Sequence, residues 1–170
     1  MKPLVSIIMG STSDWLVMQE AAKILDQFKI PFEVNALSAH RVPEEVAVFG
    51  KSASSRGVKV IIAGAGGAAH LPGVIAAFTT CPVIGVPCKS ATSLDGWDSL
   101  LSIVQMPPGV PVATVGVDGG QNAGILAVQI LGTGDEKITG ELKKFKEKLK
   151  EKVLKANEEL KAHKFGSRTN

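Results

Sequence analysis

Residues 58–70 read VKVIIAGAGGAAH, a run of Val and Ile that passes directly into a glycine-rich segment. The strand predicted over Val58–Ala63 has no polar alternation, which is typical of a strand buried on both faces of a parallel sheet. From Gly64 onward the backbone can approach a ligand closely, and ligands bind at the carboxyl ends of parallel strands. This stretch therefore predicts an α/β sheet with a binding site at one edge.

Short β-branched segments alternate with longer amphipathic segments over residues 1–134, which we expect to form one α/β domain. The predicted strands cover Leu4–Met9, Phe32–Leu37, Val58–Ala63, Pro82–Val86 and Val112–Val117. The predicted helices cover Asp14–Phe28, Pro43–Ser55, Leu71–Phe78, Asp98–Val104 and Gln121–Leu131. Parallel strands joined by right-handed crossovers give a three-layer αβα sandwich with a central parallel sheet, and we expect the flavodoxin-like strand order.

Residues 135–165 have the pattern of one long C-terminal helix. Apolar residues recur at spacings of three and four from Ile138 to Leu160, which forms a single apolar stripe. A helix of roughly seven turns is longer than a domain of this size, so we expect its outer half to pack on a neighbouring subunit. The alternative is an extension that lies along its own domain. Residues 166–170 are expected to form a frayed tail.

Composition and charge exclude several classes of protein. The formal net charge is only +3, and most basic residues lie from Lys137 onward among acidic ones, as on a solvated helix face. No segment reaches the roughly 20 apolar residues of a membrane span and no signal peptide is visible, so we expect a cytoplasmic protein without nucleic-acid or membrane partners. Cys81 and Cys88 form no CxxC pair, and together with His40 and His70 they lack zinc-site spacing, so we expect no metal.

Polar or glycine-rich residues follow four of the five predicted strands. These segments are Gly10–Asp14, Ser38–Arg41, Gly64–His70 and Pro87–Ser90. Because the carboxyl ends of parallel strands meet at one edge of a sheet, we expect the four segments to surround one pocket.

The first two segments have the residues needed to bind a phosphorylated molecule and move a proton. Ser11 and Ser13 offer hydroxyls beside backbone N–H groups at a helix N-terminus, which suits a phosphate. Asp14 either accepts hydrogen bonds from ribose hydroxyls or caps its own helix. Arg41 matches phosphate oxygens, and His40 can take and give a proton near neutral pH. We expect His40 to act as the general acid and base; the alternative is a structural, hydrogen-bonded histidine.

The third segment permits two interpretations. Gly64, Gly66 and Ala69 fit the G-x-G-x-x-A dinucleotide fingerprint, but no acidic residue follows the next strand, so we expect no dinucleotide cofactor. A small carboxylate or carbon dioxide could instead lie against the backbone amides and alanine methyls. His70 either faces this cavity or caps the helix that begins near Pro72.

Three long motifs and one helical segment resemble a known family. They are Gly10-Ser11-x-Ser13-Asp14-Trp15, Ser38-Ala39-His40-Arg41-x-Pro43, the segment Ala63–Gly73, and the segment Asp98–Pro107. These stretches are similar to the class I N(5)-carboxyaminoimidazole ribonucleotide mutases of bacterial purine biosynthesis. The similarity runs from about Val5 to Leu131.

The resemblance implies a cofactor-free homo-octamer whose flavodoxin-like core moves a carboxylate from the exocyclic nitrogen of an aminoimidazole ribonucleotide to a ring carbon. It implies that the Gly64–His70 loop encloses carbon dioxide between release and recapture, and that His40 is the acid and base. The candidate catalytic residues are His40 and His70. The candidate substrate-binding residues are Ser11, Ser13, Asp14, Ser38, Arg41, Ala65, Gly66, Gly67 and Leu71.

Two features favour class I, and two depart from the family pattern. Class II relatives use free carbon dioxide and usually have Lys after the motif histidine, whereas this chain has Arg41 and a Gly-Gly-Ala-Ala-His segment. The loop Asp118–Asn122 is shorter than usual, and Lys89 replaces a neutral amide. The alternative functions are an aminoimidazole ribonucleotide carboxylase that uses free carbon dioxide and a non-catalytic nucleotide- or flavin-binding module.

Overall fold

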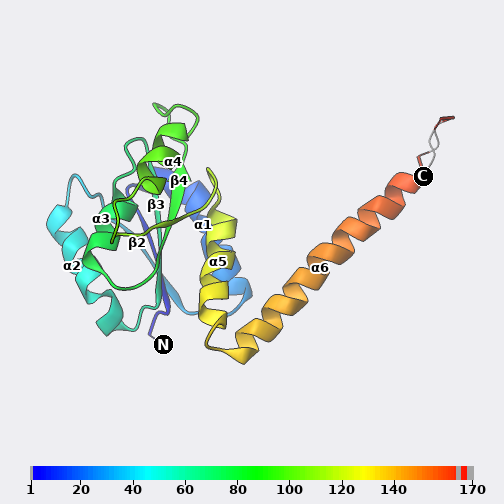
Figure 1. The fold of residues 1–170 in the computed structure, drawn as a ribbon, viewed down its shortest axis with the longest axis horizontal. Coiled ribbons are helices and arrows are strands. Elements are labelled where there is room, and N and C mark those ends of the chain that lie inside the picture. The colour runs from blue at the N-terminus through cyan, green and yellow to red at the C-terminus, as the bar shows by residue number, and fades with distance from the viewer. Residues whose placement is uncertain (1, 164–165, 168–170) are drawn as a thin grey trace.

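A five-stranded parallel sheet with the order β2-β1-β3-β4-β5 forms the centre of the molecule (Figure 1). The structure is a computed structural model that describes residues 2–163 and 166–167. The strands are β1 (Val5–Met9), β2 (Phe32–Ala36), β3 (Val60–Gly66), β4 (Val83–Cys88) and β5 (Ala113–Thr114). The helices are η1 (Thr12–Asp14), α1 (Trp15–Gln27), α2 (Pro43–Arg56), α3 (Leu71–Phe78), α4 (Trp97–Val104), α5 (Gly120–Gly132) and α6 (Glu136–Lys161). This arrangement confirms the predicted flavodoxin-like sandwich.

Helices cover both faces of the sheet, and the central strand packs against both layers. Figure 1 shows α1 and α5 on one side of the sheet and α2 and α3 on the other. Val60 and Ile62 of β3 belong to the core cluster with α1 and α5, whereas Ile61 and Ala63 belong to the cluster with α2 and α3. Because successive side chains of a strand point to opposite faces, this accounts for the unbroken apolar run in the sequence.

The strand ranges differ from the sequence prediction most at the C-terminal ends of β3 and β5. The strand β5 is only Ala113–Thr114, whereas the sequence predicted Val112–Val117. It is an edge strand, and only two of its residues pair in register with β4, Ala113 with Ile84 and Thr114 with Gly85. The strand β3 ends at Gly66 instead of Ala63, because Ala65 and Gly66 pair in register with the end of β4.

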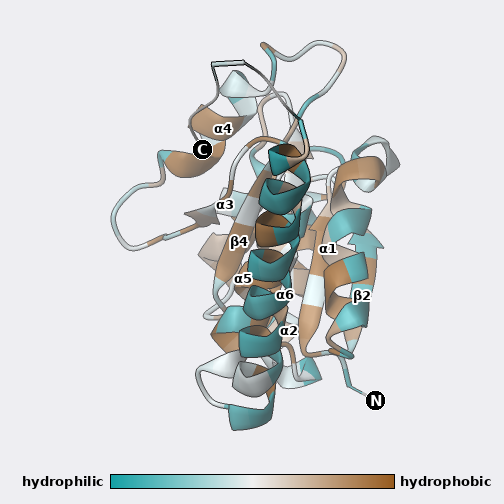
Figure 2. Ribbon diagram, turned by 90° about the vertical axis from the view of Figure 1, so that its right-hand side faces the viewer, coloured by the Kyte–Doolittle hydropathy of each residue, from teal (hydrophilic) through white to brown (hydrophobic). Residues whose placement is uncertain are grey.

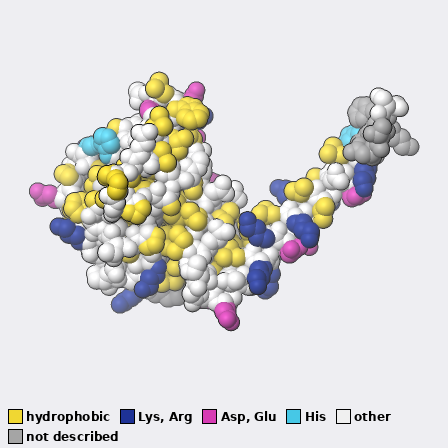
Figure 3. All heavy atoms as spheres, in the orientation of Figure 1, with side chains coloured by type: hydrophobic (Ala, Val, Ile, Leu, Met, Phe, Trp, Pro, Cys, Tyr) yellow, Lys and Arg dark blue, Asp and Glu magenta, His cyan; other side chains and the backbone are white. Residues whose placement is uncertain are grey.

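The helix α6 leaves the domain as an extended arm (Figure 1). Its base is held to the domain by Phe145, whose ring lies 5.5 Å from that of Phe28. Farther along, Leu149 and Val153 remain 45% and 68% exposed. The ribbon in Figure 2 alternates between hydrophilic and hydrophobic colours along α6, and Figure 3 shows apolar side chains among charged ones on the arm. Residues 164–165 of the predicted helical segment, and 168–170 of the predicted frayed tail, lie outside the described residues.

The interface between α1 and α5 depends on a glycine. A Cβ atom at Gly120 would lie 2.1 Å from the backbone oxygen of Val17, so a side chain there would push the two helices apart. We expect Gly120→Ala to cost about 1–3 kcal/mol of folding free energy, as overpacking does. Gly140→Ala is the control, since nothing lies within 4 Å of its Cβ position on α6, and it should stabilise by up to about 1 kcal/mol. Urea unfolding at fixed protein concentration measures both, and equal effects of the two substitutions would contradict this packing argument.

Candidate active site

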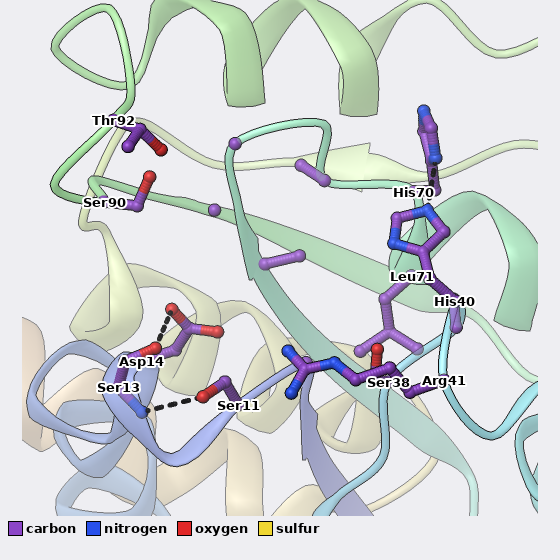
Figure 4. A pocket seen from close by; sticks show the side chains of 16 residues that line it. Ser11, Ser13, Asp14, Ser38, His40, Arg41, His70, Leu71, Ser90 and Thr92 are labelled. Carbon is purple, nitrogen blue, oxygen red and sulfur yellow. Dashed lines mark hydrogen bonds between the residues drawn. The ribbon is translucent and has the colours of Figure 1, made fainter.

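One pocket of about 290 Å³ lies at the carboxyl edge of the sheet and is lined by residues from four strand-end segments. Figure 4 shows the side chains of 16 residues that line it. They include all eleven residues predicted from the sequence: Ser11, Ser13, Asp14, Ser38, His40, Arg41, Ala65, Gly66, Gly67, His70 and Leu71. The strand order explains the convergence, because β1 and β3 are neighbours at the point where the chain reverses its direction across the sheet.

The segment after β1 supplies hydroxyl groups and a buried carboxyl group. The hydroxyl of Ser11 accepts a hydrogen bond from the backbone N–H of Ser13 at 3.3 Å and so caps η1. Asp14 occupies the N-cap position of α1 but makes no side-chain cap bond. Its carboxyl group instead lines the pocket, only 6% exposed, which decides between the two alternatives for its position. Burial raises the pKa of Asp14, and hydrogen bonds from Ser11 and Ser13 partly oppose this.

The segment between β2 and α2 carries the cation of the pocket wall. The backbone N–H groups of Arg41 and Val42 both donate to the carbonyl of Ser38, which closes a tight turn. In Figure 4 the guanidinium of Arg41 extends across the pocket toward Ser11. An anion that enters between them would meet a guanidinium on one side and hydroxyls on the other.

The segment between β3 and α3 places a second histidine against the first. Ring nitrogens Nε2 of His40 and Nδ1 of His70 lie 2.7 Å apart, and the rings meet edge to face. His70 occupies the N-cap position of α3, but its side chain makes no cap bond. The structure therefore decides between the two alternatives for its position, and the side chain lies at the pocket.

Hydrogen bonds from two serines of helix α4 hold the glycine-rich turn in place. The hydroxyl of Ser99, which is fully buried, shares its one hydrogen between the carbonyl oxygens of Gly67 at 3.1 Å and Cys88 at 3.2 Å. The hydroxyl of Ser102 donates to the carbonyl of Ala68. Gly67 has φ +60°, a conformation that residues with a Cβ rarely adopt. These contacts fix the backbone that forms the small-residue wall of the pocket.

Sequence reasoning missed several contributors to the pocket. Ser90 and Thr92 line it from the segment after β4, and Ser99 and Ser102 support it through hydrogen bonds. Ser90 belonged to a strand-end segment that the sequence had marked, but only the fold shows which side of the turn faces the cavity. The serines of α4 lay in a motif that carried the family resemblance without an assigned role.

The two departures from the family pattern lie together outside the pocket. The backbone N–H of Lys89 donates to the Asp118 carboxylate at 2.9 Å, and the N–H of Asp118 donates to the carbonyl of Pro87 at 2.8 Å. Neither side chain lines the pocket. The short loop after β5 is therefore pinned to the end of β4, and the two departures form a single local contact.

The thiol of Cys88 lies close to the pocket without taking part in it. Burial raises its pKa to about 12, and the nearby carboxylates of Asp14 and Asp118 add to the shift. A thiol with so high a pKa is protonated at physiological pH and is a poor nucleophile. Within residues 2–163, 166 and 167 no group of three or more His, Cys, Asp or Glu side chains is arranged to hold a metal ion.

A flavodoxin-like sheet with a phosphate-compatible pocket and paired imidazoles defines a class of protein, the α/β enzymes that act on small phosphorylated molecules. The sequence model of one family, described as AIR carboxylase, matches residues 4–152. The chain belongs to this family.

Relatives and solved structures agree with this assignment. The chain is 59% identical over 148 residues to the N5-carboxyaminoimidazole ribonucleotide mutase of Pyrococcus abyssi, covering 87% of this chain and 84% of that one. It is 56% identical over 162 residues to the mutase of Bacillus subtilis, covering 94% and 99%. The crystal structure of Treponema denticola PurE2-S38D matches 95% of this chain and 99% of its own, with a TM-score of 0.84 and 28% identity. No helix in the described part of the chain has the length and apolar character needed to cross a bilayer.

Asp14→Asn should stabilise the ligand-free protein at neutral pH. The pKa of Asp14 is raised above 3.8 by folding, so the wild type loses stability as pH rises through the folded pKa, whereas Asn cannot ionise. The gain should therefore be present at pH 7 and disappear as pH falls toward about 4. Urea unfolding across this range measures it, with Asp26→Asn on the exposed side of α1 as control. A gain that grows toward low pH would have the wrong sign.

Proposed function

We propose that this chain is an N(5)-carboxyaminoimidazole ribonucleotide mutase, which converts its substrate to 4-carboxyaminoimidazole ribonucleotide. The observation that carries the proposal is the single pocket that joins the serine-bearing turn, His40, Arg41 and the Gly64–His70 segment. The names of relatives that match nearly full length, including those of Bacillus subtilis and Thermotoga maritima, support the same reaction.

The substrate ribonucleotide fits the distribution of polar groups in the pocket. Ser11, Ser13, Ser38 and Arg41 bind its phosphate, since hydroxyls, backbone amides and a guanidinium all favour phosphate oxygens. The carboxyl group of Asp14 accepts hydrogen bonds from the ribose. Its raised pKa agrees with a buried position at which substrate hydroxyls supply the missing partners.

The small-residue wall encloses the carboxylate that moves. Ala65, Gly66, Gly67 and Leu71 leave room for carbon dioxide beside the two histidines, and α4 holds their backbone rigid. Carbon dioxide that reached water would be lost, so a closed pocket serves both halves of the reaction. His40 gives a proton to the departing nitrogen and removes one from the ring carbon that is carboxylated. The reaction needs no cofactor, because the proton removed at carbon replaces the one given to nitrogen.

A second candidate is carboxylation from free carbon dioxide, favoured by the family description AIR carboxylase and by fungal relatives. The Schizosaccharomyces pombe protein named phosphoribosylaminoimidazole carboxylase is 56% identical, but the chain matches only 28% of its length. That name therefore describes a protein with much additional sequence. The relatives of matching length are named mutases, which supports the mutase here.

Substrate feeding tests the proposal directly. N(5)-carboxyaminoimidazole ribonucleotide alone should be converted without added bicarbonate. Turnover only of aminoimidazole ribonucleotide with high bicarbonate would show the carboxylase instead. Binding without turnover of either compound would indicate a nucleotide- or flavin-binding module. His40→Asn should lower kcat by about 10²–10⁴-fold and leave substrate binding intact, as loss of a general acid–base group does.

A matched pair of variants tests the phosphate site. Arg41→Ala should weaken substrate binding by about 10- to 100-fold, because a charge-assisted hydrogen bond is lost. Lys89→Ala removes a cation from the same edge of the sheet, but its side chain does not line the pocket and binding should be unchanged. Isothermal titration of the product with each variant gives the comparison, and equal losses would point to long-range attraction instead of a contact.

The arm formed by α6 supports assembly into a homo-oligomer, for which the family resemblance suggests an octamer. Its outer half exposes Leu149 and Val153, and α4 exposes Trp97, Leu101 and Val104 at 63%, 50% and 52%. Between the base of α6 and the domain lies a further cavity of about 550 Å³. Such unburied apolar surface is typical of subunit interfaces. A cytoplasmic location agrees with two free cysteines, which a reducing compartment preserves.

Light scattering on the full chain should show a large symmetric oligomer. The double substitution Leu149→Glu with Val153→Glu should release smaller species, because it places charges on the apolar stripe. Lys155→Glu, off the stripe, adds the same type of charge and should leave the assembly intact. A monomeric wild type would exclude the proposed role of α6.

A further inference from the structure

The contact between His40 and His70 is the shortest polar contact between side chains of the pocket. Their ring centroids lie 4.9 Å apart and their planes are nearly perpendicular, at 84°. The two residues are thirty positions apart and come from different strand-end turns. Only the fold brings them together, and nothing in the phosphate-binding arrangement requires it.

Backbone hydrogen bonds close both turns that carry the imidazoles. The turn that carries His40 is closed by the hydrogen bonds from Arg41 and Val42 to the carbonyl of Ser38. The turn that carries His70 is closed by a bond from Ala69 to the carbonyl of Gly66, and the His70 carbonyl accepts from Val74 in the first turn of α3. The pairing is therefore built into two fixed turns.

The hydrogen bond sets limits on where the protons lie. A neutral imidazole has one N–H donor and one acceptor nitrogen, so one ring must donate and the other accept. His70 stands at the start of α3, where unpaired backbone N–H groups carry partial positive charge. The partial positive charge favours a lone pair at Nδ1 of His70, which accepts the hydrogen bond, over an N–H group at the same atom. Nε2 of His40 is then the donor.

The orientation of the rings assigns the remaining nitrogens. With Nε2 engaged by His70, the other nitrogen of His40 is Nδ1, which in Figure 4 lies on the side of the ring toward the pocket interior. The second nitrogen of His70 points away from the pocket in the same view. Both rings line the pocket, but only His40 directs a ring nitrogen that is free of the histidine pair toward its interior.

We propose that His70 is a positioning residue that accepts the Nε2 proton of His40 and thereby keeps Nδ1 as the nitrogen that exchanges protons with the substrate. This rests on the proposed mutase function. Nδ1–H of the imidazolium gives its proton to the departing nitrogen, and the neutral Nδ1 then takes one from the ring carbon. The Nε2–H bond to His70 persists throughout, so His70 neither gains nor loses a proton and His40 ends as it began.

The arrangement has a mechanistic advantage over a lone histidine. A free imidazole divides its time between two tautomers and rotates about its side-chain bonds, so only a fraction of molecules would present a basic nitrogen to the substrate. With a fixed acceptor, every enzyme molecule presents the same basic nitrogen to the substrate, so the rate is not lowered by molecules in the wrong tautomer.

Two substitutions at position 70 separate positioning from mere packing. His70→Ala removes the acceptor and should lower kcat by about 10- to 100-fold with little change in KM, the range expected for a hydrogen bond to a charged group. His70→Asn places an amide oxygen near the position of Nδ1 and should restore most of kcat, although it cannot carry a proton. Equal losses in both variants, or wild-type kcat in His70→Ala, would overturn the proposal.

A spectroscopic measurement decides the same point without activity. In the ligand-free enzyme with ¹⁵N-labelled histidine, His40 should be the Nε2–H tautomer in the wild type and in His70→Asn, and a mixture in His70→Ala. His163→Asn removes the signals of the third histidine and assists assignment. An Nδ1–H tautomer of His40 in the wild type would overturn the proposal even if the enzyme is an active mutase. Conversely, a wild type without mutase activity that shows the Nε2–H tautomer would overturn the function and leave the pairing intact.

Discussion

The whole site depends on one constraint, the parallel direction of the five strands. Parallel strands carry all their carboxyl ends to the same edge of the sheet, so the connections after β1, β2, β3 and β4 must meet there. The connection after β1 leads to β2 on one side of β1, whereas the connection after β3 leads to β4 on the other side. A crevice therefore opens between these two connections. Every polar group of the pocket is placed by this geometry, and none lies on a strand interior.

The pocket joins a backbone that is fixed by hydrogen bonds to a side chain whose burial costs free energy. A carboxyl group that is only 6% exposed is a feature that a protein core would avoid. Burial raises the pKa of Asp14, and its Ser11 and Ser13 hydrogen bonds only partly compensate. The free-energy cost of this buried carboxyl group is offset by the rest of the molecule. Two apolar layers enclose the sheet, and α4 supports the glycine-rich turn through buried Ser99.

The arm formed by α6 contrasts with the rest of the chain. Its first turns are fixed by the Asp135 cap, which accepts hydrogen bonds from the backbone of Lys137 and Ile138, and by the Phe28–Phe145 contact. Ile138 and Leu142 also pack, partly buried, against the core, but α6 has no fully buried residue. Ion pairs at i and i+3, such as Lys144 with Glu141, add little at exposed positions. The inner part of the apolar stripe is therefore covered by the domain, whereas Leu149 and Val153 stay exposed, in keeping with the proposed assembly.

The sequence by itself determined the element order, the three layers and most of the residues that line the pocket, because each depends on local patterns or on the direction of parallel strands. The run of Val and Ile in β3 and the residues after each strand were sufficient for these. Only the tertiary structure decided that β5 is short, that Asp14 does not cap its helix, that Lys89 meets Asp118, and that His70 touches His40. These features depend on side-chain directions and on distances between segments remote in the chain, which no local periodicity encodes.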